Sequence, residues 1–194
     1  TDAGATLACL DHESGVEKTA LIDETTPGDV KFRARVRATI ETGGYAGIVW
    51  RAGTDTLTEG AEDCYAAVLD IANDVLLVRE YNNGAVTQKD NPALTSAVDT
   101  WYTIGVIAKG DDFWVYATAS SNLTDDDDVF SADYLLSEFT DATHSTGKCG
   151  VMSITTGGRF DDVKLVSLQD RVIPADEIVV SGEAIWRTIA PFNE

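Results

Sequence analysis

The stretch from Lys31 to Ile40 alternates strictly between polar and apolar side chains, and it constrains the fold more than any other feature of the chain. A period of two places one set of side chains on each face of an extended strand, whereas a helix repeats its apolar residues every three or four positions. The face predicted to be buried carries Phe32, Ala34, Val36, Ala38 and Ile40. The segment therefore predicts a β-strand that lies with one face against a core.

Further strands are predicted at regular intervals. Residues 64–70 and 75–81 form two of them, and Asn82-Asn83-Gly84 leads into a third at 85–89, because Asn-Gly accepts the positive φ of a tight hairpin turn. Residues 101–108 and 113–119 form a second hairpin through residues 109–112. Short strands separated by turn signals predict an all-β, two-sheet antiparallel β-sandwich. The 194 residues are enough for a single domain, 1–194, with a substantial core.

One segment, 124–143, does not follow this pattern. It is acidic, contains neither glycine nor proline, and spaces Phe130, Tyr134 and Leu135 as on a helix face. Aspartates are good residues for starting a helix, so Asp126–Asp128 are expected to cap one short turn. We expect a long loop with a helical turn, laid over one edge of a sheet.

A set of short motifs recurs in a fixed order between Phe32 and Leu168. It reads Phe32-Arg-Ala-Arg-Val36, Gly47-Ile-Val-Trp-Arg51, Cys64-Tyr-Ala-Ala-Val68, Trp101-Tyr-Thr-Ile-Gly105, Phe113-Trp-Val-Tyr116, Gly150-Val-Met and Gly158-Arg-Phe-Asp-Asp-Val163. This order resembles the concanavalin A-like, or laminin G-like, jelly-roll domains, with a family-like core at 31–168. The resemblance implies a jelly-roll sandwich that recognises a ligand, most often a glycan. Fold alone does not fix function.

The remaining residues, 169–194, lie beyond this resemblance. They contain two candidate strands, 178–181 and 184–189. This extension either completes the sandwich or reaches a neighbouring subunit, so residues 171–194 are the candidate segment for a homo-oligomer or a larger assembly.

Composition narrows the range of partners. The 33 acidic residues against 14 basic ones give a net charge of −19, which repels nucleic acid phosphates and anionic membranes. Such a surface fits a halophilic or marine origin, or simply an acidic protein. No apolar run approaches the roughly 18 residues of a membrane span, so no membrane insertion is expected, and no signal peptide is visible at the start of the sequence.

Cys9, Cys64 and Cys149 are the only cysteines, and no spacing among them suggests a zinc site. Cys64 falls in an apolar strand and is interpreted as a core residue. A disulfide between Cys9 and Cys149 stays open.

Catalysis and metal binding have little support. Neighbouring residues in a strand face opposite ways, so Asp161 and Asp162 make a poor pair for flanking a glycosidic bond. His12 and His144 lack a nucleophile setting. We expect no enzyme and no required cofactor. The family resemblance does imply Ca²⁺ binding by Asp161 or Asp162, and the alternative is an aspartate that hydrogen-bonds backbone at a strand start.

Aromatic residues give the clearest indication of a glycan site. If Phe113, Val115 and Ala117 point inward, Trp114 and Tyr116 point outward and offer a flat platform for sugar rings. The alternative is that the 124–143 segment covers them. Tyr45 and Arg51 are candidate additional contacts. Trp50 and Trp101 are interpreted as core.

Four of the 14 basic residues share one strand face: Lys31, Arg33, Arg35 and Arg37. One hypothesis is a site for an anionic glycan or acidic partner. The alternative is cross-strand pairing with acids such as Asp161 or Glu177.

The sequence therefore predicts a non-catalytic recognition module that binds carbohydrate on an exterior surface, extracellular or on a virion. The alternative is a structural assembly protein, such as a viral decoration or tail component or a surface-layer or filament subunit.

Overall fold

The computed structural model describes residues 10–11, 18–22, 28–39, 44–53, 63–154 and 158–168. Several sequence predictions fall outside these ranges: the strands at 178–181 and 184–189, the role of 171–194, and those on Cys9, His12 and Glu177. They stay predictions.

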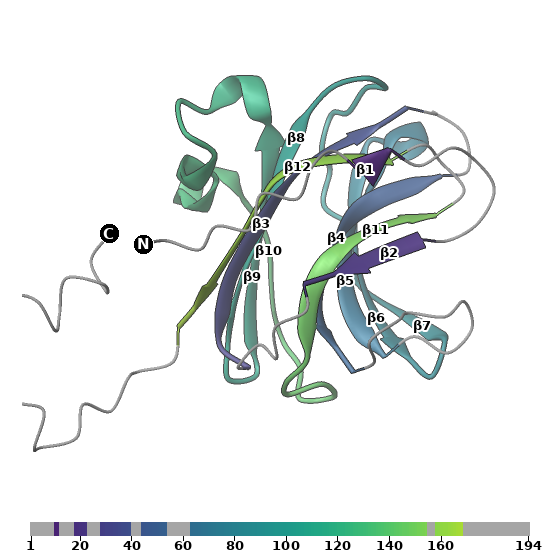
Figure 1. Ribbon diagram of the computed structural model, residues 1–194, viewed down its shortest axis with the longest axis vertical. Helices are drawn as coiled ribbons and strands as arrows, with labels where there is room; N and C mark the ends of the chain where they lie inside the picture. Colours follow the sequence, from purple (N-terminus) through teal and green to yellow (C-terminus); the bar gives the residue numbers. More distant parts are fainter. Residues whose placement is uncertain are drawn as a thin grey trace, which may run out of the picture.

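The described chain forms two antiparallel sheets packed face to face, which confirms the predicted β-sandwich of the jelly-roll kind (Figure 1). One sheet, here the β3 sheet, has the strand order β1-β12-β3-β8-β9-β10, and the other, the β4 sheet, has the order β2-β11-β4-β5-β6-β7. The strands of the β3 sheet are β1 (Leu10–Asp11), β3 (Val30–Ala38), β8 (Tyr102–Lys109), β9 (Asp112–Ala119), β10 (Leu135–Thr140) and β12 (Gly158–Ser167). Those of the β4 sheet are β2 (Lys18–Leu21), β4 (Tyr45–Ala52), β5 (Cys64–Asp70), β6 (Val75–Asn82), β7 (Ala85–Asp90) and β11 (Lys148–Ile154).

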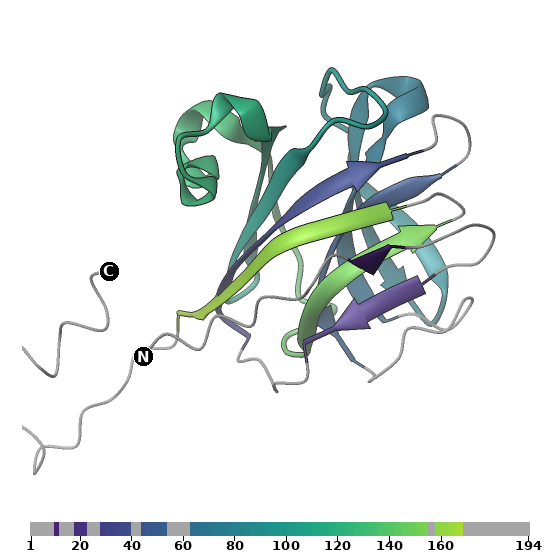
Figure 2. The same cartoon turned by 45° about the horizontal axis from the view of Figure 1, so that its top comes forward.

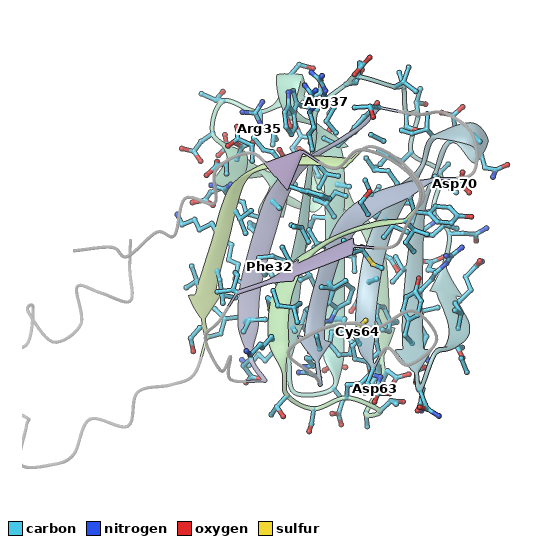
Figure 3. All side chains as sticks on the ribbon, turned by 45° about the vertical axis from the view of Figure 1, so that its right-hand side comes forward. Phe32, Arg35, Arg37, Asp63, Cys64 and Asp70 are labelled. Atoms are coloured by element: carbon cyan, nitrogen blue, oxygen red, sulfur yellow. The ribbon has the colours of Figure 1, made fainter. Side chains whose placement is uncertain are left out.

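Strand β3 shows why the alternating pattern folds this way. Phe32, Ala34, Val36 and Ala38 are completely buried between the sheets, and the intervening basic residues lie on the outer face. In Figure 3, Phe32 lies partway along the strand and Arg35 and Arg37 lie together toward its end. Burying this apolar face, together with those of the other strands, keeps the two sheets together.

Both predicted hairpins are present. Asn83 and Gly84 have φ angles of 48° and 76° in the turn between β6 and β7, as a tight primed turn requires. Gly110, with a φ of 56°, turns β8 into β9.

The segment 124–143 corrects one expectation. It holds the predicted capped turn, η3 (Asp126–Phe130), between two further 3₁₀ turns, η2 (Ser120–Asn122) and η4 (Ala132–Tyr134). Its second half, however, is not a loop: it forms β10, which pairs with β9 and makes the edge of the β3 sheet. The expectation of a loop was wrong for this half. Leu135-Leu136 breaks the polar–apolar alternation that predicts a strand, but β10 forms because β9 offers it backbone hydrogen-bond partners along its edge. One more 3₁₀ turn, η1 (Ile71–Asn73), joins β5 to β6.

An aromatic cluster fills the core at one end. The Trp50 ring stacks on Tyr65 with centroids 5.8 Å apart, and Phe113 lies 4.8 Å from Tyr65. Trp50 is fully buried, as predicted, and so are Cys64 and Cys149. Strand β5, which places Tyr65 in this cluster, runs from Cys64 to Asp70 across the molecule (Figure 3).

Candidate functional site

The 3₁₀ turns η3 and η4 lie on the outer face of the β3 sheet, on the side away from the β4 sheet (Figure 2). A capping box holds the start of η3: the Asp125 side chain accepts from backbone N–H groups and the Asp128 side chain accepts from the Asp125 N–H. Val129 and Phe130 then pack onto Gly105 of β8. A Cβ atom at Gly105 would lie 2.8 Å from the Phe130 ring, so a larger residue there would force the ring to shift.

Arg33 of β3 connects these turns to the sheet. Its side chain, only 6% exposed, donates to Asp127 of η3 at 2.5 Å and to Asp162 of β12 at 2.8 Å. Lys164 reaches Asp127 from the other side at 2.6 Å. Burial alone would lower the pKa of Arg33, but the bonds to Asp127 and Asp162 outweigh it and raise that pKa. The cluster therefore keeps its charges and fixes η3 in place.

The prediction that Asp161 and Asp162 face opposite ways is wrong. A bulge shifts the register of β12 against β3 between Asp161 and Lys164, and Asp162 has a φ of 45°. Both carboxylates consequently lie on the outer face, where Asp162 binds Arg33 and Asp161 lies 3.9 Å from Arg35. The pairing of the basic face with Asp161, weighed from sequence as an alternative, is present.

Asp126 and Asp162 are neighbouring carboxyl groups whose pKa values shift in opposite directions. Burial and the neighbouring Asp162 raise the pKa of Asp126, whose carboxyl also accepts from Thr103 at 2.6 Å. Burial alone would raise the pKa of Asp162, but hydrogen bonds from Asp126 and Arg33 lower it.

Asp161 and Asp162 do not fit a calcium ion. Ca²⁺ requires six to eight oxygen ligands, whereas these carboxylates lie beside two guanidinium groups. Among the residues that the structure describes, no three His, Cys, Asp or Glu side chains are grouped to hold a metal ion.

Trp101 is not the core residue that the sequence predicted. Its ring is only partly buried and lies on the outer face between Arg35 and Arg37, at 5.2 and 5.6 Å from their guanidinium carbons. Arg37 also pairs with Asp99 at 3.2 Å.

Beside these turns lies an open groove of about 580 Å³. It combines carboxylates, an amide, hydroxyl groups, one ammonium group and two aromatic rings. Its lining consists of Lys31, Asn122, Thr124, Asp127, Asp128, Phe130, Ser131, Asp133 and Tyr134. Phe130 supports Lys31, whose Nζ lies 4.1 Å from the ring centroid, and the Tyr134 hydroxyl donates to the Asn122 carbonyl.

Of the four residues predicted to contact glycan, Trp114 retains its predicted position best. It is partly exposed on the outer face of the β3 sheet, and the residues paired across from it are Ile107 and Glu138. Lys31 is paired with Ile107 in turn, so Lys31 and Trp114 lie about 10 Å apart on one face. Lys31, which lines the groove, thus lies on the same sheet face as Trp114.

The other three are placed differently. Tyr116 is only 8% exposed, because Phe130 covers it with a ring centroid 5.5 Å away; this is the covering by 124–143 that the sequence left open. Tyr45 lies on the β4 sheet, where Arg79 stacks on it at 4.6 Å, far from Trp114 in the strand order.

Arg51 is buried instead of exposed at a strand end. It is 2% exposed and has a φ of 53°. Its guanidinium donates to the carbonyl oxygens of Gly28, Gly110 and His144 and stacks on Phe113, 4.7 Å from the ring centroid. Burial lowers its pKa. Arg51 therefore joins three loops and takes no part in a surface site.

A second charged cluster closes the edge of the sandwich between β7 and β10. Lys89 of β7 donates to Glu80 and to Asp141, and Asp141 also accepts from Tyr65 at 2.6 Å. Burial would lower the pKa of Lys89 and raise that of Asp141, but their mutual bond outweighs it in both. Burial and Asp141 together raise the pKa of Tyr65.

These shifts predict how stability depends on pH. Because folding raises the pKa of Lys89, its charged form stabilises the folded state at pH values below the ordinary pKa of 10.5. This stabilisation is lost as the pH rises through the raised pKa. Because folding lowers the pKa of Asp141, its carboxylate stabilises the folded state at pH values above the ordinary pKa of 3.8. This stabilisation is lost as the pH falls through the lowered pKa. We expect the loss of unfolding free energy in Lys89→Met to be largest between about pH 6 and 10 and to shrink outside that range. Urea unfolding across pH measures it. Lys109→Met, at an exposed turn, is the control, and an equal loss at every pH would contradict the prediction.

Most of the groove was not predicted from the sequence. Lys31 was grouped with the arginines, and Asp127, Asp128 and Tyr134 were assigned to a long loop with a helical turn. The helical spacing of Phe130 and Tyr134 beside an acidic run was the one available signal. Within the described ranges, no helix is long and apolar enough to cross a bilayer.

Comparison with known proteins supports the fold. No family of known proteins and no curated protein matches by sequence. Among solved structures, the carbohydrate-binding module CBM66 of Bacillus subtilis is similar, with a TM-score of 0.65 at 18% identity over 84% of this chain and 94% of that one. The exoplasmic/lumenal domain of VIP36, in a form bound to Ca²⁺ and Man3GlcNAc, gives 0.60 at 12% identity over 91% and 88%. A galectin-like protein of unknown function from B. subtilis gives 0.58 at 13% over 81% and 80%. At these identities the similarity concerns the fold alone.

Proposed function

We propose that this domain is a non-catalytic carbohydrate-binding module of the concanavalin A-like kind, and that it binds glycan on the outer face of the β3 sheet. The observation that carries the proposal is the groove beside η3 and η4, which lies on the same sheet face as the partly exposed Trp114. The related fold of CBM66 and VIP36, one a carbohydrate-binding module and one bound to Man3GlcNAc, supports it.

The groove has the chemistry that sugar recognition needs. Carboxylates of Asp128 and Asp133 and the hydroxyl groups of Thr124 and Ser131 offer hydrogen-bond acceptors to sugar hydroxyls. An aromatic face packs against the apolar C–H face of a sugar ring, and Trp114 supplies such a face. The distance of about 10 Å from Lys31 to Trp114 suits an oligosaccharide rather than a single sugar.

The roles of the sequence-predicted residues are revised accordingly. Trp114 remains the proposed aromatic contact, whereas burial removes Tyr116 and Arg51 from the surface. The charged clusters already described are occupied by ion pairs within the chain, which favours recognition over catalysis. An exterior location, extracellular or on a virion, suits a glycan-binding role.

A glycan-array screen of the purified chain, with calcium and then with EDTA, tests the proposal. We expect saturable binding that EDTA does not abolish. Trp114→Ala should lower the affinity for the best ligand at least about tenfold, because an aromatic side chain that stacks on a ligand is a typical binding hot spot. Val86→Ala, which removes a 53% exposed side chain from the other sheet, is the control and should bind as the wild type does. Unchanged affinity in Trp114→Ala, with an intact fold, would remove this face as the site.

A further inference from the structure

We propose that the groove selects uncharged glycans and rejects glycans that carry carboxylate or sulfate groups. This inference rests on the proposed function, because it names the class of ligand for the same site. It also argues against the hypothesis, one of the two that the sequence left open, that the basic face of β3 binds an anionic partner.

The arginines of that face are already paired. Arg33, Arg35 and Arg37 lie within 4 Å of five aspartates: Asp99, Asp126, Asp127, Asp161 and Asp162. Arg35 and Arg37 additionally cover the ring of Trp101. An anionic ligand would have to displace these carboxylates, which come from the same chain and are therefore present at high effective concentration.

Lys31, unlike the three arginines of β3, has no carboxylate partner among the described residues. Its ammonium group lies over the Phe130 ring and faces the groove. Three aspartates line the same groove, of which Asp127 is occupied by Arg33 and Lys164. Asp128 and Asp133 are exposed, and neither forms an ion pair among the described residues. The local charge thus remains negative even where the chain is most basic.

Two physical effects follow. Exposed carboxylates accept hydrogen bonds from neutral sugar hydroxyls but repel a sugar carboxylate, and the net charge of −19 repels it further. Discrimination of this kind comes from a repulsive element and not from a better contact. Because the repulsion is electrostatic, salt should weaken it, whereas neutral binding should hardly depend on salt.

The test compares a neutral oligosaccharide found in the screen with the same oligosaccharide oxidised at C6 to the uronic acid. We expect the oxidised form to bind the wild type at least about tenfold more weakly in low salt. The difference in affinity between the neutral and the oxidised oligosaccharide should narrow several-fold in 1 M salt, and also in the variant Asp133→Asn. Asp111→Asn is the matched control: it removes the same charge from the β8–β9 turn, at the other end of that hairpin from η2, and should leave the difference unchanged.

The outcomes separate this inference from the proposed function. Equal or tighter binding of the oxidised sugar would overturn the selectivity and leave carbohydrate recognition standing. The selectivity is also overturned if Asp111→Asn narrows the difference in affinity between the two sugars as much as Asp133→Asn does. A chain that binds neither sugar nor any glycan of the array would overturn the proposed function, and this inference with it.

Discussion

Gly47→Ala is expected to destabilise the domain by about 3 kcal/mol or more, or to prevent folding, because the new methyl group has no space. Gly47 lies on β4, where a Cβ atom would be 2.0 Å from the Ala67 carbonyl oxygen and 2.6 Å from the Val68 Cα. Both atoms are backbone of the adjacent strand β5. The strand cannot move away without breaking the ladder that holds the middle of the β4 sheet.

Gly53→Ala is the matched control for this prediction. A Cβ atom there meets nothing closer than 3.6 Å, so the same chemical change at the end of the same strand should be tolerated. Guanidinium unfolding followed by circular dichroism measures both variants. If Gly47→Ala unfolded at the same denaturant concentration as Gly53→Ala, the close approach of β4 and β5 would be refuted.

Arg51→Met is expected to cost about 3 kcal/mol of unfolding free energy, the second large effect. The substitution keeps an apolar side chain of similar length but leaves the carbonyls of Gly28, Gly110 and His144 without their donor. A hydrogen bond from a charged donor contributes about 1.5–3 kcal/mol, and the total stays near the lower end because these carbonyls belong to exposed or half-buried residues that water can reach. Because the three carbonyls belong to three separate loops, the cost should appear as cooperative loss of the whole end of the sandwich.

Arg51→Lys separates charge from geometry. An ammonium group retains the positive charge, but it cannot reproduce the planar fork that reaches three carbonyls at once. Its stability should therefore lie between those of Arg51→Met and the wild type in the same unfolding experiment. Wild-type stability in Arg51→Met would show that these hydrogen bonds contribute nothing net.

The sequence predicted the positions of several strands but not the role of Arg51. The alternation of β3 and the hairpin turns are local properties, so strands β3, β6, β7, β8 and β9 were predicted close to where they lie. Arg51 was misplaced because its positive φ turns the side chain inward at the end of β4, and its three acceptors lie in other loops.

The site shows the same division. The alternation rule assigned Trp114 correctly to the outer face, but it failed at Asp161 and Asp162, since it assumes a regular strand and β12 is bulged there. Strand β10 was missed because its pairing depends on the edge of β9 and not on its own pattern. The groove itself needs η3 and η4 docked on Gly105, a contact between residues far apart in the chain.

The sequence alone determined that the chain is an acidic β-sandwich and which side chains of β3 enter its core, because the apolar residues of that strand follow a two-residue period and charge follows composition. Only the tertiary structure decided which charges remain available at the surface. Arg33 meets Asp127 and Asp162 across separations of 94 and 129 residues, and no local pattern encodes those meetings. Folding thus changes a row of basic residues into a neutralised platform and leaves Lys31 beside the groove.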